Sequence, residues 1–132
     1  MKLITRETDY AVRALAYIAG QKKEVVPVSE LVKELTIPRA FLRKLLQILN
    51  RKGILKSYKG NGGGFALAKR AREIFLVDLI KIFQGPLQVS ECLFKRDICP
   101  DISTCLLKNK LGRIERRVVS ELKSINLASL LN

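Results

Sequence analysis

The chain has 132 residues and carries a formal net charge of +13, with 25 lysine and arginine residues against 12 acidic ones. Its 48% hydrophobic content excludes a disordered chain, and its length suits a single domain with a core of its own. No apolar stretch reaches the roughly 18 residues of a membrane span. Charged residues interrupt the apolar N-terminal segment, so we interpret it as structure rather than a signal peptide and expect a cytoplasmic protein with reduced thiols.

Three helices are predicted in the first part of the chain. Residues 8–20 place apolar side chains at helical spacing. Ser29 is expected to cap a second helix over residues 30–36, which ends before Pro38 because a residue that precedes proline is disfavoured in a helix. Pro38 suits the first turn of a third helix, over residues 38–53.

A hairpin and two further helices are predicted after these. The strand-like runs at 54–58 and 65–68 flank the sequence KGNGGG, whose glycines allow the positive φ angles of a tight turn. Residues 74–84 are typical of another amphipathic helix. A loop follows, and a long helix is expected from about Ser103 onward.

This order of elements predicts a mainly α fold with a small β-hairpin wing, a winged helix-turn-helix. Between Leu35 and Arg72 the chain holds ten basic residues and no acidic one, so positive charge concentrates on the third helix and the hairpin. Double-stranded DNA is therefore the expected partner; a solvated basic surface and an RNA-binding protein are the alternatives, and an anionic membrane surface ranks below nucleic acid. The predicted DNA-contacting residues are Arg39, Arg43, Lys44, Arg51, Lys56, Lys59 and Asn61.

The long C-terminal helix carries an apolar stripe that is hard to bury within so small a chain. A symmetric homodimer would bury it and present two DNA-binding heads to a palindromic operator. Packing against the first helix is the alternative, and both arrangements are compatible. The predicted dimerisation residues are Leu107, Leu111, Ile114, Val118, Leu122 and Ile125.

All three cysteines, Cys92, Cys99 and Cys105, fall in one short stretch with the spacing C-x6-C-x5-C. Structural zinc sites use closer pairs, whereas iron–sulfur clusters are held by cysteine thiolates from a loop that wraps around a larger object. From spacing alone, a cluster, redox-active thiols, zinc and inert cysteines all stay open. An enzyme is not expected, because the chain has no histidine and GNGGG lacks the GK[ST] continuation of a phosphate-binding loop.

The whole chain resembles a family of bacterial winged-helix regulators that includes IscR, NsrR, RirA and CymR. The resemblance is carried by the opening MKLITRETDYAVRALAYIA, the segment IPRAFLRKLLQILNRKGILKSYKGNGGGFALAK, the cysteine triplet and the tail INLASLL. It implies a homodimeric transcription regulator, expected to be a repressor, whose promoter binding depends on an iron–sulfur cluster of either 2Fe–2S or 4Fe–4S type. Nitric oxide, redox state or iron status is the expected signal. The alternative is a cluster-free member that responds through thiol oxidation or a partner protein.

The fourth cluster ligand is where members of this family differ. IscR-like members use a histidine shortly after the third cysteine, where this chain has Lys108. NsrR-like members resemble the chain more closely, since they use an aspartate near the start of the first helix, supplied by the partner subunit. Asp9 occupies that place, although an acidic residue in a first helical turn also stabilises the helix dipole. Weaker candidates are Glu7, Asp97, Asp101 and an exogenous ligand.

Together these patterns predict a division of the chain into three parts. Residues 1–84 would form the winged helix-turn-helix domain, residues 85–103 the cysteine-bearing loop, and residues 104–132 the dimerisation helix and tail.

Overall fold

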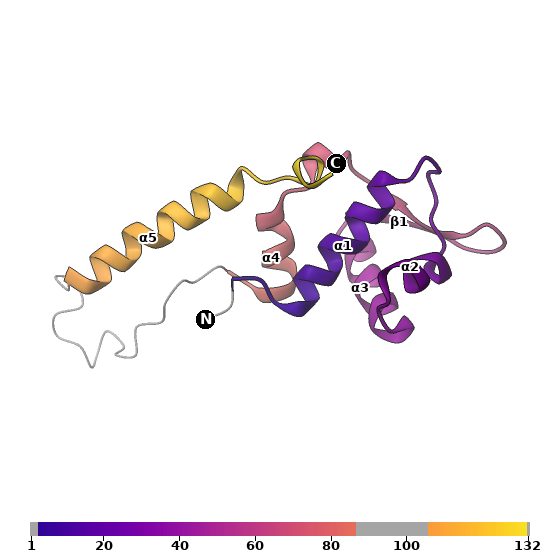
Figure 1. The fold of residues 1–132 in the computed structure, drawn as a ribbon, viewed down its shortest axis with the longest axis horizontal. Helices are drawn as coiled ribbons and strands as arrows, with labels where there is room; N and C mark the ends of the chain where they lie inside the picture. The colour runs from indigo at the N-terminus through magenta and orange to yellow at the C-terminus, as the bar shows by residue number, and fades with distance from the viewer. Residues whose placement is uncertain (1–2, 87–105, 132) are drawn as a thin grey trace.

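The fold is mainly helical and contains one two-stranded antiparallel hairpin (Figure 1). The computed structural model describes residues 3–86 and 106–131. The elements, in chain order, are α1 (Arg6–Gly20), α2 (Val28–Leu35), α3 (Arg39–Arg51), β1 (Leu55–Tyr58), β2 (Gly64–Leu67), the 3-10 helix η1 (Ala71–Glu73), α4 (Leu76–Gln84), α5 (Leu106–Lys123) and the 3-10 helix η2 (Leu127–Leu130).

Helix α1 lies at the centre of the helical core. The Thr5 side chain caps it by accepting a hydrogen bond from the Thr8 backbone N–H at 3.4 Å. Its apolar face contacts α2, α3 and α4, as the predicted helical periodicity requires. The core is aliphatic, and its fully buried members include Leu15, Leu31, Leu42, Leu46, Leu49 and Leu79.

Helix α2 begins earlier than the sequence predicts. We expected Ser29 to be the N-cap, but the helix starts at Val28 and its N-cap is Pro27, which makes no side-chain capping bond. The backbone explains the shift, because Val26 is fixed in a β-bridge to Phe65 and Pro27 already has the extended conformation of a cap. The Ser29 side chain is therefore left exposed, near the hairpin.

The hairpin forms as predicted and gains a third, short partner. Strands β1 and β2 pair from Leu55↔Leu67 to Tyr58↔Gly64. On the other edge of β2, Phe65 and Val26 exchange two backbone hydrogen bonds of 2.9 Å. Gly64 has a φ of +154°, and a Cβ there would overlap the Val26 carbonyl, so this close approach requires glycine.

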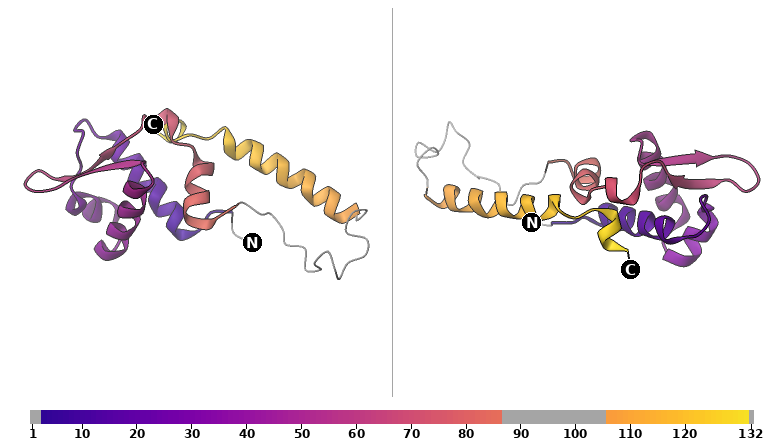
Figure 2. Two further views of the ribbon diagram at one scale, coloured as in Figure 1. Left: turned by 180° about the vertical axis from the view of Figure 1, so that it is seen from behind. Right: turned by 90° about the horizontal axis from the view of Figure 1, so that it is seen from above.

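Helix α5 projects from the rest of the molecule: its first residues lie farthest from the other helices, and the helix runs back toward them (Figures 1 and 2). The helix ends at Lys123, where the Ser124 hydroxyl donates to the Glu121 carbonyl at 2.6 Å. Ile125, which we expected on the helical stripe, therefore lies beyond the helix. Its carbonyl accepts a hydrogen bond from the Leu76 backbone N–H at 3.0 Å, which joins the C-terminal segment to the start of α4.

In the part of the chain that the structure describes, the helices are too short or too polar to span a lipid bilayer. The cysteine-bearing loop and the first residues expected in the long helix lie outside the described residues, so the predicted three-part division of the chain stays a prediction.

Candidate nucleic-acid interface

Helix α3 buries one side and leaves a basic side in solvent. Its core-facing residues are Leu42, Leu45, Leu46 and Leu49, all at most 2% exposed. The N-terminal half of the helix is held against α1, where the Phe41 and Tyr10 rings meet edge to face with centroids 5.7 Å apart. This packing directs the predicted DNA-contacting residues of the helix outward, and Arg39, Arg43, Lys44 and Arg51 are all exposed.

The wing adds a second set of exposed polar side chains. Lys56 lies on β1, and Lys59 and Asn61 lie in the turn between the strands; all three are exposed. The turn is stabilised by a hydrogen bond of 3.0 Å from the Gly63 N–H to the Gly60 carbonyl. The hairpin therefore holds these side chains beside α3 on a backbone that is itself hydrogen-bonded at both edges of β2.

A groove of about 630 Å³ lies between α3, the start of α2 and the wing. Of the predicted residues it brings together Arg39, Arg43 and Lys59, whereas the other four lie outside its lining. Its lining also includes polar residues that charge patterning in the sequence did not indicate: Ser29, Gln47, Asn50, Ser57 and Tyr58. Gln47 follows Arg43 by four residues, and this helical spacing was the signal that could have identified it.

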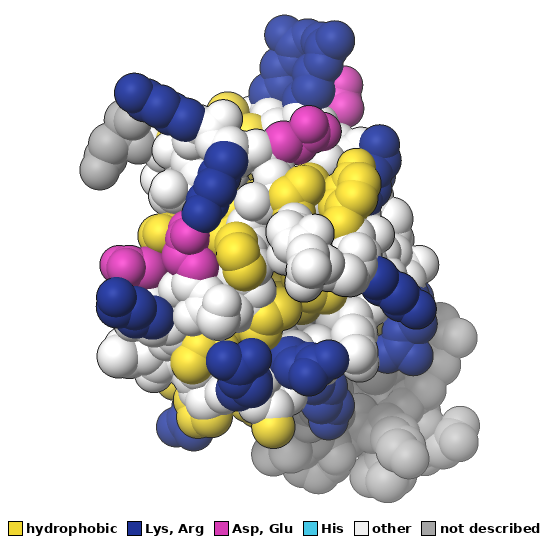
Figure 3. All heavy atoms as spheres, turned by 90° about the vertical axis from the view of Figure 1, so that its right-hand side faces the viewer, with side chains coloured by type: hydrophobic (Ala, Val, Ile, Leu, Met, Phe, Trp, Pro, Cys, Tyr) yellow, Lys and Arg dark blue, Asp and Glu magenta, His cyan; other side chains and the backbone are white. Residues whose placement is uncertain are grey.

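Positive charge dominates the exposed side chains of this region. Figure 3 views the end of the molecule that carries α2, α3 and the wing; lysine and arginine side chains lie along several edges, and acidic side chains gather in the upper and left parts. The salt bridges formed between described residues, Arg13–Asp9 and Lys23–Glu30, involve none of the predicted DNA-contacting residues. The charges of the predicted DNA-contacting residues are therefore available to a polyanion.

A polar cluster connects α1 to α2 behind this surface. The Tyr17 hydroxyl donates to Glu30 Oε2 at 2.8 Å, and the Lys23 ammonium donates to Glu30 Oε1. The hydrogen bond to the Glu30 carboxylate raises the pKa of Tyr17 to about 12. Hydrogen bonds from Lys23 and Tyr17 lower the pKa of Glu30, so the carboxylate is ionised at neutral pH.

The predicted cluster ligands divide between described and undescribed parts of the chain. Cys92, Cys99 and Cys105 lie outside the described residues, as do the weaker candidates Asp97 and Asp101. Glu7 is exposed in the first turn of α1. Asp9 is also in that turn, with a side chain that is 43% exposed and pairs with the Arg13 Nε at 3.2 Å. In residues 3–86 and 106–131, no group of three acidic side chains is close enough to hold a metal ion.

The apolar stripe of α5 is only partly covered. Leu107 and Ile114 are 67% and 51% exposed, and Leu111 and Val118 are half-buried. Leu122 is buried within the protomer, and Ile125 is half-buried beyond the helix end. Leu3 of the N-terminal arm joins Ile114, Val118 and Leu122 around a hollow of about 450 Å³.

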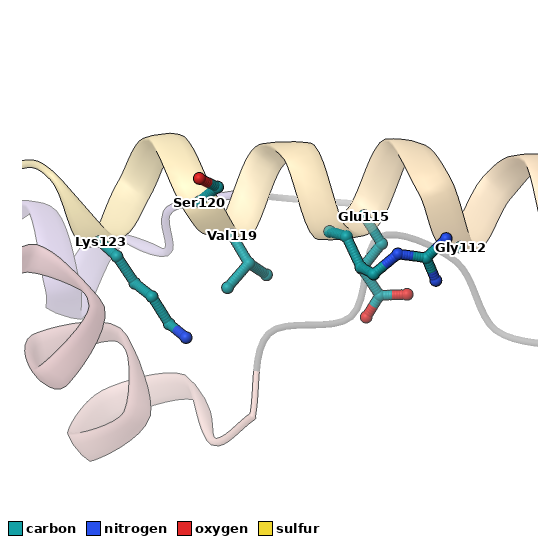
Figure 4. A pocket seen from close by; sticks show the side chains of 6 residues that line it. Gly112, Glu115, Val119, Ser120 and Lys123 are labelled. Atoms are coloured by element: carbon teal, nitrogen blue, oxygen red, sulfur yellow. The ribbon is translucent and has the colours of Figure 1, made fainter.

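Another hollow, of about 440 Å³, lies along a different side of α5 (Figure 4). Glu115, Val119 and Lys123 extend from the helix on the side that faces α4. Every residue lining this hollow belongs to the one helix, so no second described element encloses it.

A helix-turn-helix packed against a hairpin, with an exposed basic helix beside the wing, defines a winged-helix protein, as the sequence predicted. Comparison with known proteins gives the family. Residues 4–132 match the family model described as "Rrf2: Iron-dependent Transcriptional regulator". The chain therefore belongs to the Rrf2 family of transcriptional regulators, and this confirms the resemblance seen in the sequence.

Individual relatives agree with this assignment. The chain is 32% identical over 125 residues to a protein of Aquifex aeolicus named as an HTH-type transcriptional regulator, covering 93% of this chain and 87% of that protein. It is similar in structure to CymR, the global cysteine regulator of B. subtilis, with a TM-score of 0.79 at 24% identity, over 98% of this chain and 96% of that one. IscR of T. potens has a TM-score of 0.75 at 22% identity, over 98% and 85% of the two chains. These two likenesses establish the shared fold.

Proposed function

We propose that the protein is a homodimeric, DNA-binding transcriptional repressor of the cytoplasm whose operator binding is controlled by an iron–sulfur cluster. The observation that carries the DNA-binding part is the groove between α3 and the wing, where Arg39, Arg43 and Lys59 share one lining. This arrangement supports a mode in which α3 enters the major groove of DNA with the wing beside it. The other exposed basic residues, Lys44, Arg51 and Lys56, flank the groove and would contact phosphates.

The homodimer is supported by the exposed part of the α5 stripe. Leu107 and Ile114 expose much of their side chains although they lie on an apolar face, and such a patch is unfavourable in water. A second copy of α5 would cover them. The two recognition helices would then face the two halves of a palindromic operator, since a two-fold symmetric protein matches a two-fold symmetric site.

Cluster control rests on the cysteine triplet and on Asp9. Three thiolates and one carboxylate oxygen would hold the cluster, with Asp9 supplied by the partner subunit as in NsrR-like proteins. The half-exposed Asp9 carboxylate fits this role, because a surface carboxylate is accessible to another subunit once its ion pair with Arg13 opens. A bound cluster supplies a centre that nitric oxide, oxidants or iron shortage would alter. The protein's own contribution is to link that centre to the first turn of α1.

Anaerobic purification with an absorption spectrum and with iron and sulfide assays tests cluster binding. We expect a brown protein with visible absorption bands, and loss of these bands in Cys99→Ala. Asp9→Ala should lower the iron content of the protein or the stability of the cluster in air. Glu7→Ala, a change in the same helical turn, should have no effect on either.

A colourless protein without iron, even after reconstitution, would contradict cluster control. It would favour the cluster-free alternative, in which the same DNA-binding scaffold responds through its thiols or a partner protein. Equal affinity for RNA and for duplex DNA would instead favour the RNA-binding alternative.

A further inference from the structure

Helix α3 presents one continuous polar side opposite its buried side, and only part of that polar side lines the groove beside the wing. Arg39, Arg43, Gln47 and Asn50 follow one another at steps of four, four and three residues, and all four line the groove beside the wing. Such steps keep side chains on one face of a helix. Lys44 and Arg51 belong to the same polar side, three and four residues from Gln47, but they do not line the groove. The groove-lining set is better placed to reach base edges beside the wing, and Lys44 and Arg51 lie next to it.

We propose that Gln47 is a specificity-determining residue that reads an adenine in the operator, about two base pairs from a guanine read by Arg43. This inference rests on the proposed DNA-binding function and extends it to the sequence that is recognised. A glutamine amide offers one donor and one acceptor, which match N7 and the N6 amino group of adenine in the major groove. An arginine guanidinium matches O6 and N7 of guanine in the same way.

The spacing follows from helix geometry. Gln47 lies four residues after Arg43, which corresponds to about 6 Å along the helix at 1.5 Å per residue. Successive bases on a strand of B-DNA are about 3.4 Å apart, so the two side chains reach positions about two base pairs apart.

The surroundings of Gln47 leave its amide available. The side chain is exposed, and within the described ranges it forms no hydrogen bond with another side chain or with the backbone. On the opposite wall of the groove lie Tyr58 and Lys59 of the wing. Lys59 would bind the sugar–phosphate backbone of the DNA, and this contact would fix the depth at which α3 enters the major groove.

The test is selection of binding sites from a pool of random duplexes by the full-length protein, repeated with variants. For the wild type we expect each half-site to contain a G·C pair and, about two positions away, an A·T pair. Replacing that A·T pair should weaken wild-type binding by about 5- to 150-fold. Gln47→Ala should lose this discrimination and keep the preference for G·C. Gln47→Glu should change the preferred base from adenine to cytosine, because a carboxylate accepts from the cytosine N4 amino group.

Lys44→Ala is the matched control, since Lys44 is an exposed residue of the same helix outside the groove lining. It should weaken binding to all duplexes alike and leave both base preferences in place. Retention of the full adenine preference by Gln47→Ala would overturn the inference while leaving DNA binding intact. Failure of the wild type to select any duplex would overturn both the inference and the proposed function.

Discussion

The Thr8 hydroxyl donates a hydrogen bond of 2.7 Å to Oε1 of Gln84, joining the first turn of α1 to the last residue of α4. The same Gln84 oxygen accepts from the Thr5 backbone N–H at 2.9 Å, and Gln84 Nε2 donates to the Leu3 carbonyl at 3.2 Å. The side-chain amide of Gln84 thus joins the N-terminal arm to the end of α4. Asp9 follows Thr8 directly, so this contact fixes the predicted fourth ligand relative to the point where α4 ends.

Substitution of Thr8 and substitution of Gln84 should both destabilise the fold, but by different amounts. Thr8 is fully buried, and Thr8→Val leaves Gln84 bonded to Thr5, so we expect a loss of about 1 kcal/mol. Gln84→Leu also leaves the Thr5 N–H and the Leu3 carbonyl without this partner and should cost about 1–3 kcal/mol. Urea unfolding of both variants and of the double variant measures the coupling. Strictly additive losses would contradict a direct Thr8–Gln84 bond.

Gly64 should tolerate substitution much less than Gly62, another wing glycine with a positive φ. Gly64→Ala places a Cβ against the Val26 carbonyl, so the Phe65–Val26 bridge must open. Gly62 also has a positive φ but has open space around its Cα, so Gly62→Ala should cost only the strain of that φ, about 1–2 kcal/mol. Thermal unfolding should rank the variants wild type, Gly62→Ala, Gly64→Ala in order of falling stability. Equal losses for the two variants would show that the bridge to Val26 contributes nothing.

The Tyr17–Glu30–Lys23 cluster should make stability depend on pH at both extremes. The folded state lowers the pKa of Glu30 below its ordinary value of 4.5, so its contribution is present above pH 4.5 and lost as pH falls through the lowered pKa. The folded state raises the pKa of Tyr17 from 10.0 to about 12, so that contribution is present below pH 10 and lost as pH rises through about 12. Glu30→Gln should be less stable than wild type at pH 7, and the difference should vanish in acid. A constant difference in unfolding temperature from pH 7 to pH 3 would contradict this.

A charge on the exposed apolar stripe of α5 should separate the proposed dimer. Ile114→Glu places a carboxylate where we expect a second copy of the helix, and this should weaken dimerisation by about 100-fold or more. Ser120→Glu adds the same charge at an exposed position of α5 outside the stripe and should leave the dimer intact. Sedimentation equilibrium measures the dimer dissociation constant of each variant and of the wild type. A wild-type monomer, or equal weakening by both variants, would argue against an interface on the stripe.

Periodicity predicted most of the fold but few of its long-range contacts. The helical spacing of leucines predicted α3, and the glycine run predicted the wing, because local sequence determines both. The bridge of Val26 to Phe65 was missed, since a single paired residue before a proline has no periodic pattern. This bridge also displaced the start of α2 from the predicted Ser29 cap. The Thr8–Gln84 bond joins residues 76 positions apart, which no local pattern reveals.

The candidate site shows the same limit. Charge alone identified Arg39, Arg43 and Lys59, which the structure brings into one groove. Charge could not identify Gln47, which is uncharged; only its helical spacing from Arg43 could have done so. The roles of the cysteines, of Asp9 and of the individual basic residues stay predictions.

The salt dependence of duplex DNA binding tests most directly the claim that α3 and the wing form the DNA-binding surface. The decisive comparison sets the triple variant Lys44→Ala, Arg51→Ala, Lys59→Ala against a control with the same loss of charge on α5, Lys110→Ala, Arg113→Ala, Lys123→Ala. Each lost phosphate contact should reduce the magnitude of the slope of log K against log salt by about 0.9. The slope of the first variant should therefore be smaller than that of the wild type by about 2–3 for each subunit. The control should keep the wild-type slope and affinity. Equal losses in the two variants would mean that binding follows net charge alone, and would contradict a DNA-binding surface on α3 and the wing.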